Sequence, residues 1–177
     1  PWLTKDANNF LKNNLNKQMV GLEFGSGRST IFFAKKLKKL VSVEDHVEWY
    51  NKVTDLIKKN GIDNIDYRLI ETTKNKDNYP GIVDEFNDEY FDFILVDGVE
   101  REKCVIKSLP KLKKGGYLVI DNVNWYLPSN SISPTSIPSN GLLKNEFMNT
   151  FWNESKTWER IWTSNGVTDT AIFIKPL

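Results

Sequence analysis

Glycines and glutamates near the N-terminus stand at a spacing that can bind a small molecule. Gly25 and Gly27 are separated by one residue and follow a short apolar run, and Glu23 precedes the pair. Glycine is required where a strand turns sharply into a helix or where a ligand approaches the backbone. Glu44 follows Gly27 by 17 residues and ends a second apolar run, a position from which an acidic side chain can accept both hydroxyls of a ribose.

The carboxylate beside the glycines indicates which ligand this pattern holds. A dinucleotide site also fits a glycine pair, but Thr30 stands where that fingerprint has its third glycine. Glu23 would repel a pyrophosphate and would suit an ammonium or a sulfonium. A ligand with a ribose for Glu44 and a cationic amino-acid end for Glu23 is S-adenosylmethionine. The alternative is a structural turn that holds no ligand.

Alternating strand-like and helix-like segments would position these residues. Short apolar runs predict buried strands, and segments of helical periodicity follow them. The expected strands are Met19–Gly25, Leu40–Glu44, Ile65–Ile70, Phe91–Gly98 and Gly115–Asn122. The expected helices are Thr4–Leu15 with Thr4 as its cap, Ser29–Leu40, His46–Gly61, one within the polar region Thr72–Glu89, and Glu100–Leu112, bent or started at Pro110.

The order of these elements predicts an α/β fold. Repeated strand–helix units favour a parallel sheet with helices on both faces. Asn165-Gly166, between Thr157–Ser164 and Val167–Lys175, is a hairpin signal, so the sheet should close with an antiparallel pair. The serine- and proline-rich segment Trp125–Gly141 leaves the fifth strand. It is interpreted as a lid over a ligand site, with a mobile loop as the alternative.

Composition excludes several classes of function. The chain has 24 basic and 23 acidic residues, and its lysine runs at positions 35–39 and 111–114 fit solvated helix faces better than a nucleic-acid patch. Cys104 is alone and is expected on a buried helix face, and a single histidine excludes a His-rich zinc site. Trp2 and Trp49 are expected in the core or at its edge. No apolar run approaches the ~20 residues of a membrane span and no signal peptide is visible, so the default location is cytoplasmic.

Four motifs together resemble those of class I S-adenosylmethionine-dependent methyltransferases. They are EFGSGRST, SVEDHVEWY, FDFILVDG and GGYLVIDN, and the resemblance covers roughly Met19 to Asn122. It implies a single domain over residues 1–177, a Rossmann-like three-layer sandwich whose seven-stranded, mostly parallel sheet ends in the antiparallel hairpin. It also implies that the cofactor is bound by Glu23, Gly25, Ser26, Gly27, Ser29, Glu44, Asp45, His46 and Asp97. For His46, a plain helix N-terminal residue is the equal alternative.

The ends of the fourth and fifth strands partly resemble the metal-dependent catechol and caffeoyl-CoA O-methyltransferases. That similarity implies Asp97, Asp121 and Asn122 as oxygen ligands of Mg²⁺, which would acidify a bound hydroxyl. Two departures weaken it: the glycine loop is shorter than in that subgroup, and Glu100 replaces its lysine. Asp121 and Asn122 could instead begin a loop and bond to nearby backbone.

Acid–base chemistry without a metal is the second possibility. Asp97, Glu100 and Asp121 are then the catalytic residues. Arg101 could hold an acidic substrate or simply lie on a helix surface, and Trp125–Tyr126 could form one wall of the acceptor site.

The sequence as a whole predicts transfer of a methyl group from S-adenosylmethionine to a small-molecule acceptor, at an oxygen. The near-neutral charge and the absence of an added recognition domain favour a small acceptor over nucleic acid. Two alternatives remain open. An NAD(P)-dependent oxidoreductase fits Glu44 but not Glu23 or Thr30, and a non-catalytic module would keep the fold and bind a partner.

Overall fold

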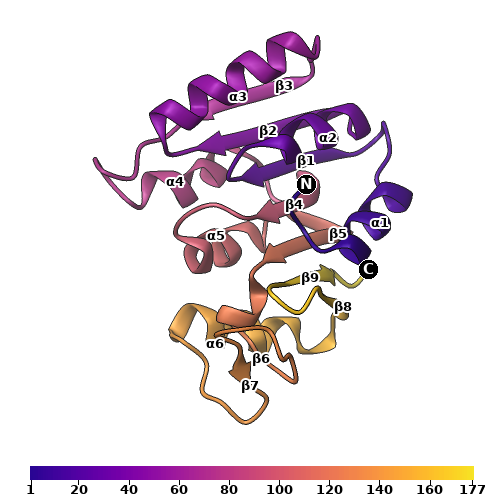
Figure 1. The fold of residues 1–177 in the computed structure, drawn as a ribbon, viewed down its shortest axis with the longest axis vertical. Helices are drawn as coiled ribbons and strands as arrows, with labels where there is room; N and C mark the ends of the chain where they lie inside the picture. The colour runs from indigo at the N-terminus through magenta and orange to yellow at the C-terminus, as the bar shows by residue number, and fades with distance from the viewer.

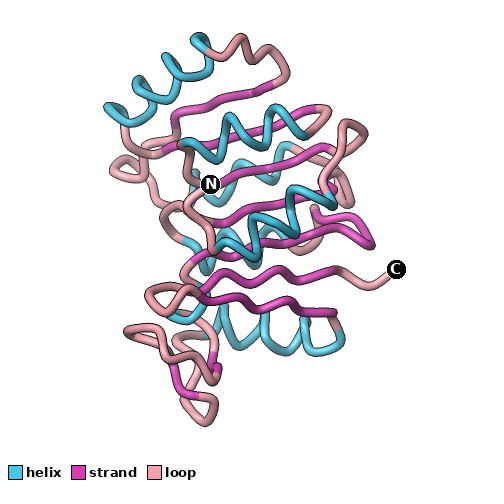
Figure 2. Tube along the Cα trace, turned by 45° about the vertical axis from the view of Figure 1, so that its right-hand side comes forward, coloured by secondary structure: helices cyan, strands magenta, loops and turns pink.

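The computed structural model describes residues 1–177 and contains one large sheet between two layers of helices (Figures 1 and 2). The strand order is β3-β2-β1-β4-β5-β9-β8. Strands β1 to β5 are parallel, and β9 pairs antiparallel with both β5 and β8. The bounds are β1 Val20–Phe24, β2 Lys39–Glu44, β3 Ile65–Leu69, β4 Phe91–Val96, β5 Leu112–Asp121, β8 Glu159–Ser164 and β9 Asp169–Ile174. The predicted seven-stranded sandwich with a terminal hairpin is confirmed.

The helices follow the predicted order but are shorter at several ends. They are α1 Lys5–Asn14, α2 Arg28–Lys36, α3 Val47–Lys59 and α5 Arg101–Ser108. Helix α2 ends before the predicted boundary because Lys39 already begins β2. Helix α5 ends before Pro110, which cannot continue a helix. The region Thr72–Glu89 contains only the short helix α4 (Asn78–Gly81) and the 3-10 helix η1 (Ile82–Glu85).

Thr4 stands at the N-cap position of α1, but the prediction that its side chain caps the helix is wrong. No cap bond forms, and the Thr4 hydroxyl instead contacts the hydroxyl of Thr163 on β8. The Thr4 amide donates to Thr170 Oγ1 on β9 at 3.2 Å. Thr4 therefore joins the N-terminal helix to the terminal hairpin.

The segment Trp125–Gly141 is folded. It follows the 3-10 helix η2 (Val123–Trp125) and contains two short paired strands, β6 (Pro128–Ser129) and β7 (Ile137–Pro138). Ser133 is buried and donates to Asp169 on β9 at 2.7 Å. The segment lies at the end of the molecule beyond β8 and β9, far along the sheet from β1 and β2 (Figure 1). This placement differs from the predicted lid, and α6 (Glu146–Glu154) with η3 (Ser155–Thr157) follows as an element that the sequence reading did not assign.

Two apolar clusters cover the two faces of the sheet. One joins the sheet to α4, η1, α5 and α6, and it includes Cys104 as predicted. The other joins it to α1 and α2. Leu22 and Phe24 belong to the first cluster, so the side chain of Glu23 between them points to the second face. No helix has the length and apolar character needed to cross a lipid bilayer.

Candidate functional site

The glycine loop brings the ends of β1 and β4 into backbone contact. Gly25 has a φ of +87°, and a Cβ on it would stand 2.7 Å from the backbone nitrogen of Gly98. Both the left-handed backbone and the close approach exclude a side chain there. At Gly27 a Cβ would meet only the Trp49 ring, at 3.8 Å, so this part of the loop opens toward free space.

The backbone amides of the loop are already used by the protein. Gly25 donates to a β2 carbonyl at 2.9 Å, Ser26 donates to Glu44 Oε2 at 3.1 Å, and Gly27 donates to Thr30 Oγ1 at 2.9 Å. Phosphate-binding loops leave such N–H groups free for the ligand. In this conformation the loop therefore offers no amide cradle for a pyrophosphate.

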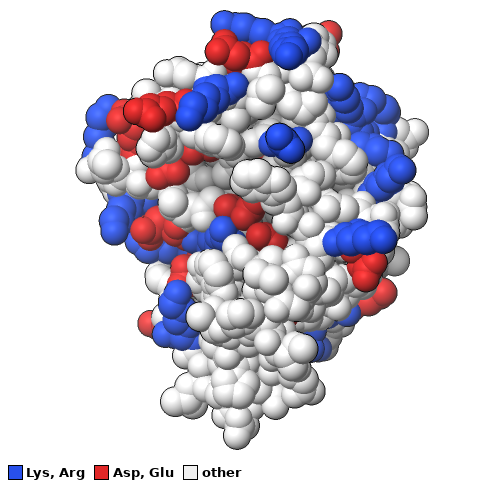
Figure 3. Space-filling view, viewed as in Figure 1, with Lys and Arg blue, Asp and Glu red and all other residues white.

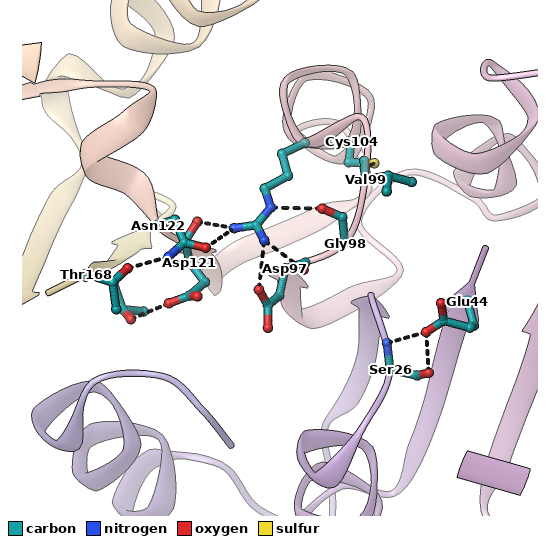
Figure 4. Close-up of polar contacts among 11 residues, drawn as sticks. Ser26, Glu44, Asp97, Gly98, Val99, Cys104, Asp121, Asn122 and Thr168 are labelled. Carbon is teal, nitrogen blue, oxygen red and sulfur yellow. Dashed lines mark hydrogen bonds and ion pairs between the residues drawn. The ribbon is translucent and has the colours of Figure 1, made fainter. Parts of the chain in front are cut away.

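Glu44 at the end of β2 holds the loop in place. Its Oε2 accepts from both the amide and the hydroxyl of Ser26, the latter at 2.6 Å (Figure 4). Its Oε1 accepts from the amides of Asp45 and His46. Because the Ser26 hydroxyl donates to Glu44, Tyr67 O–H must be the donor in the 2.7 Å contact between the two hydroxyls. All four lone-pair sites of the carboxylate are filled, so a ribose could reach Glu44 only after Ser26 moves.

Asp45 and His46 begin the turn into α3. His46 is the N-cap residue, and its Nδ1 accepts from the Trp49 amide at 3.4 Å, which is the structural alternative weighed for this histidine. Asp45 Oδ2 accepts from the Thr72 hydroxyl at 3.2 Å. Both residues lie directly after Glu44, beside the glycine loop.

A cavity of about 550 Å³ opens over the glycine loop. Four residues proposed from the sequence line it, namely Ser26, Gly27, Ser29 and Asp97, together with Trp2, Arg28, Trp49, Lys52, Asp55 and Leu56. Glu23, Gly25, Glu44, Asp45 and His46 are not on its wall. In the space-filling view acidic atoms surround a hollow near the middle of this face, whereas the end formed by β6 and β7 shows no charged side chain (Figure 3).

The two tryptophans at this cavity were predicted in or beside the core. Trp2 is instead 77% exposed and Trp49 is 38% exposed. Trp49 Nε1 donates to the Ser26 carbonyl at 2.7 Å, which ties α3 to the glycine loop. These rings give the cavity an apolar wall that a flat or aliphatic ligand group can contact.

Glu23 lies beneath the loop and not on the cavity wall, which corrects the prediction that it lines the site. Its side chain is fully buried. Oε2 accepts from Thr30 Oγ1 at 2.6 Å and Ser42 Oγ at 2.7 Å, whereas Oε1 is buried without a hydrogen-bond partner. Burial raises the pKa of Glu23 to about 7, against the opposing effect of the hydroxyl donors.

The raised pKa predicts a pH-dependent loss of stability that Glu23→Gln should abolish. The folded state holds the Glu23 proton more tightly than the unfolded state, so the stabilisation is complete below about pH 4.5 and is lost as pH rises to about 7. Between about pH 5.5 and pH 8 this one group should lower the free energy of unfolding by about 2 kcal/mol. Urea unfolding at both pH values should show that loss in the wild type relative to Glu23→Gln. An equal pH response in the two proteins would contradict it, and Glu48→Gln, on the exposed first turn of α3, is the control.

Asp97 follows β4, and Asp121, the last residue of β5, lies close to it. Burial and the neighbouring Asp121 carboxylate raise the pKa of Asp97, and Arg101 opposes the shift. Burial also raises the pKa of Asp121, whose Oδ1 accepts from Thr170 Oγ1 at 2.7 Å. Asp97 is the member of the pair that lines the cavity. The predicted proximity of the two carboxyl groups is therefore present.

The guanidinium of Arg101 occupies the centre of the proposed metal site. It donates to Asn122 Oδ1 at 2.9 Å and to Asp97 Oδ1 at 3.0 Å, within the group of contacts drawn in Figure 4. A divalent ion at that point would meet a bound positive charge. The structure contains no group of three acidic, histidine or cysteine side chains that could hold a metal. The Mg²⁺ expected from Asp97, Asp121 and Asn122 does not fit this arrangement, and Arg101 is neither free for an acidic substrate nor a surface residue, being 13% exposed.

Glu100 is directed toward lysines and does not line the cavity. Its carboxylate stands 3.8 Å from the ammonium groups of both Lys76 and Lys103. It also has a left-handed backbone, with a φ of 48°, at the start of α5. The structure thus does not bring Glu100 to the cavity wall beside Asp97.

Several residues of this region carry no signal in the sequence. Tyr67 on β3, Ser42 on β2 and Thr170 on β9 are polar residues within strands, and only the folded sheet brings them to Ser26, Glu23 and Asp121. The five bonds of Arg101 depend on the turn geometry after β4 and β5, which the sequence does not reveal. Thr30 was read as a missing glycine, although its hydroxyl links the Gly27 amide to Glu23.

Known structures with this architecture were found, whereas no protein-family model and no curated protein sequence matches the chain. An rRNA methylase from Streptococcus thermophilus is 13% identical, with a TM-score of 0.64 over 97% of this chain and 95% of that one. A candidate caffeoyl-CoA O-methyltransferase from Staphylococcus aureus is 16% identical, with a TM-score of 0.68 over 99% and 85%. A SAM-dependent methyltransferase from Aquifex aeolicus is 16% identical, with a TM-score of 0.58 over 97% and 89%. With the strand order described above, these likenesses show that the chain has the fold of the class I S-adenosylmethionine-dependent methyltransferases.

Proposed function

We propose that the protein is an S-adenosylmethionine-dependent methyltransferase that acts on an oxygen of a small molecule. The observation that carries the proposal is the cavity in which the glycine loop and Asp97 meet. Two further carboxyl groups, those of Glu23 and Asp121, lie at the adjoining strands outside the cavity wall. Glu23 is the second-last residue of β1, Asp97 follows β4 and Asp121 ends β5. Burial raises the pKa of each of the three. A cation bound beside them would favour their charged forms, and S-adenosylmethionine brings both a sulfonium and an ammonium.

The arrangement of the loop favours this cofactor over a dinucleotide. The amides of Gly25, Ser26 and Gly27 all donate to protein oxygens, so a pyrophosphate would find no free donors in the loop. The unpartnered Oε1 of Glu23 is buried beneath the loop, out of a ligand's reach in this conformation, so Glu23 would act on a bound cation through its charge and not through direct contact. Gly27, Ser29, Asp97 and the backbone of Ser26 would bind the methionine part directly, with Gly25 shaping the turn. Glu44, Asp45 and His46 would bind the adenosine part once Ser26 releases Glu44.

The residues at the strand ends would remove the proton from the acceptor. When bound, the cofactor supplies a methyl group on a sulfonium sulfur, and after transfer of the methyl group that sulfur is left as a neutral thioether. Asp97 is on the cavity wall and would take the proton of the acceptor hydroxyl, with Asp121 modulating its charge. Glu100 remains paired with lysines and takes no part. Trp2 and Trp49 would exclude water and align the reactants, which supplies much of the rate in such transfers.

The class of acceptor is proposed from charge and size. The formal net charge is +1, and the end of the molecule at β6 and β7 shows no charged side chain in Figure 3, so it offers none of the cations that phosphate contacts need. An rRNA methylase is among the proteins of similar structure, so RNA is the competing acceptor class. A Mg²⁺ ion has no part in the proposed reaction because Arg101 holds its position.

Isothermal titration with S-adenosylhomocysteine and with NAD tests the cofactor assignment. We expect S-adenosylhomocysteine to bind in the micromolar range, about −8 kcal/mol, and NAD to show no heat of binding. Tight NAD binding would favour the oxidoreductase instead. Absence of binding by either ligand, in a protein that is folded by circular dichroism, would favour the non-catalytic module.

A further inference from the structure

Arg101 uses every hydrogen-bond donor that it has. Nε donates to the Gly98 carbonyl at 2.9 Å, Nη1 to the Asp121 carbonyl at 2.6 Å and Asn122 Oδ1 at 2.9 Å, and Nη2 to the carbonyl and Oδ1 of Asp97 at 2.9 and 3.0 Å. A guanidinium has five N–H groups, and these are five acceptors. No donor remains for a substrate or for water.

The five acceptors form the oxygen shell of a cation. One is a carboxylate oxygen, one is an amide oxygen and three are backbone carbonyls, which are the ligand types that Mg²⁺ and Mn²⁺ prefer. They come from the carboxyl ends of two neighbouring strands, β4 and β5, and lie around the planar guanidinium (Figure 4). The Arg101 side chain is only 13% exposed, so bulk water does not replace these bonds.

The backbone is shaped to close this shell. Glu100 and Asn122 both have left-handed backbones, with φ values of 48° and 51°, although neither is glycine. The turn at Glu100 starts α5 so that the next residue, Arg101, reaches back to the strand ends. The turn at Asn122 orients its side chain so that Nδ2 donates to the Thr168 hydroxyl and Oδ1 accepts from the guanidinium. Two uncommon conformations thus converge on one cation.

We propose that the Arg101 guanidinium is a built-in cation that occupies a divalent-metal position between β4 and β5, so that the chain takes up no metal there. The positive charge of the guanidinium offsets the negative charges of Asp97 and Asp121. Its bonds to residues at both strand ends hold those ends in a fixed position relative to each other. One consequence rests on the proposed function: no open coordination position is available, so the acceptor hydroxyl must lose its proton to a protein carboxylate.

Mn²⁺ binding, followed by electron paramagnetic resonance, tests the proposal without any methyl transfer. The wild type and Arg160→Met, which removes an arginine that lies over Trp152 and Trp162, should bind no Mn²⁺ at about 1 mM. Arg101→Met should expose the oxygen shell and bind one Mn²⁺ at least ~10-fold more tightly than the wild type. The double variant Arg101→Met/Asp97→Asn should lose that ion.

Two results of the Mn²⁺ measurements would contradict the proposal. One Mn²⁺ bound to the wild type and lost in Asp97→Asn, or a folded Arg101→Met protein that binds none, would overturn the proposal. If Arg101→Met does not fold, the neutral variant Arg101→Gln replaces it: Mn²⁺ should raise the melting temperature of Arg101→Gln and leave that of the wild type unchanged, and no such rise would count against the built-in cation. Binding of S-adenosylhomocysteine by the wild type is measured in parallel, so failure of the cofactor assignment is seen separately.

Discussion

Alanine in place of Glu44 should weaken the binding of S-adenosylhomocysteine by about 10-fold or more. The carboxylate would accept both ribose hydroxyls, which is worth about 3–6 kcal/mol in all, but the two bonds from Ser26 must break first and offset part of that gain. A net loss of about 1.4 kcal/mol or more is about 10-fold or more in affinity. The substitution also removes four bonds that hold Ser26 and the turn into α3, so the free energy of unfolding should fall by about 3 kcal/mol. Isothermal titration and urea unfolding measure the two effects.

Three further variants show whether the loss comes from the carboxylate itself. Glu48→Ala removes an exposed glutamate four residues further along the chain and should change neither affinity nor stability. Glu44→Gln keeps the shape of the side chain but loses half of its acceptor capacity, so its affinity should lie between those of the wild type and Glu44→Ala. Ser26→Ala frees a lone pair of Glu44 and should raise the affinity. Unchanged affinity in Glu44→Ala would refute the ribose role of Glu44.

Alanine in place of Gly25 should give the second large effect, on the fold as well as on binding. A left-handed backbone at a non-glycine residue costs about 1–2 kcal/mol, and a Cβ forced against the Gly98 backbone adds about 1–3 kcal/mol. The neighbouring atoms are backbone, so no flexible side chain can move away. We expect a loss of about 3 kcal/mol in the free energy of unfolding, with S-adenosylhomocysteine binding lost because the β1 and β4 ends are pushed apart.

Gly61 provides the matched control for Gly25. It also has a left-handed backbone, with a φ of +59°, but a Cβ there would meet no atom within 4 Å. Gly61→Ala should therefore cost only the backbone part, about 1 kcal/mol, and leave ligand binding intact. Equal stability losses in the two variants would contradict the close packing of Gly25 against Gly98.

Local patterns in the sequence were enough to predict the sheet. The apolar runs before Gly25 and Gly98, together with Asn165-Gly166, mark β1, β4 and the hairpin because buried strands and tight turns have strong local requirements. Helix α6 was not predicted. Its segment Glu146–Glu154 has a buried face only through Met148 and Phe151, and its helical form depends on packing against α5 and the sheet. The strands β6 and β7 are two residues each and give no periodic signal.

The predicted site residues proved easier to locate than their roles. Gly25, Gly27, Asp97 and Asp121 lie where strand ends must meet, which follows from the parallel sheet alone. The role of Glu23 could not be predicted, because its burial beneath Thr30 depends on the packed fold. Whether Arg101 or a metal binds the oxygens between β4 and β5 depends on the direction that the Arg101 side chain takes after the left-handed residue Glu100. Neither residue spacing nor composition predicts that direction.

A crystal structure of the protein with S-adenosylhomocysteine examines the shared basis of these predictions. The ligand should fill the cavity over Ser26 and Gly27, with its ribose hydroxyls on Glu44 and its homocysteine part beside Asp97. Ser26 should have left the Glu44 carboxylate, and Arg101 should keep its five bonds. A nucleoside bound elsewhere, or an ordered complex in which Glu44 still holds Ser26 and touches no ribose, would contradict the assignment.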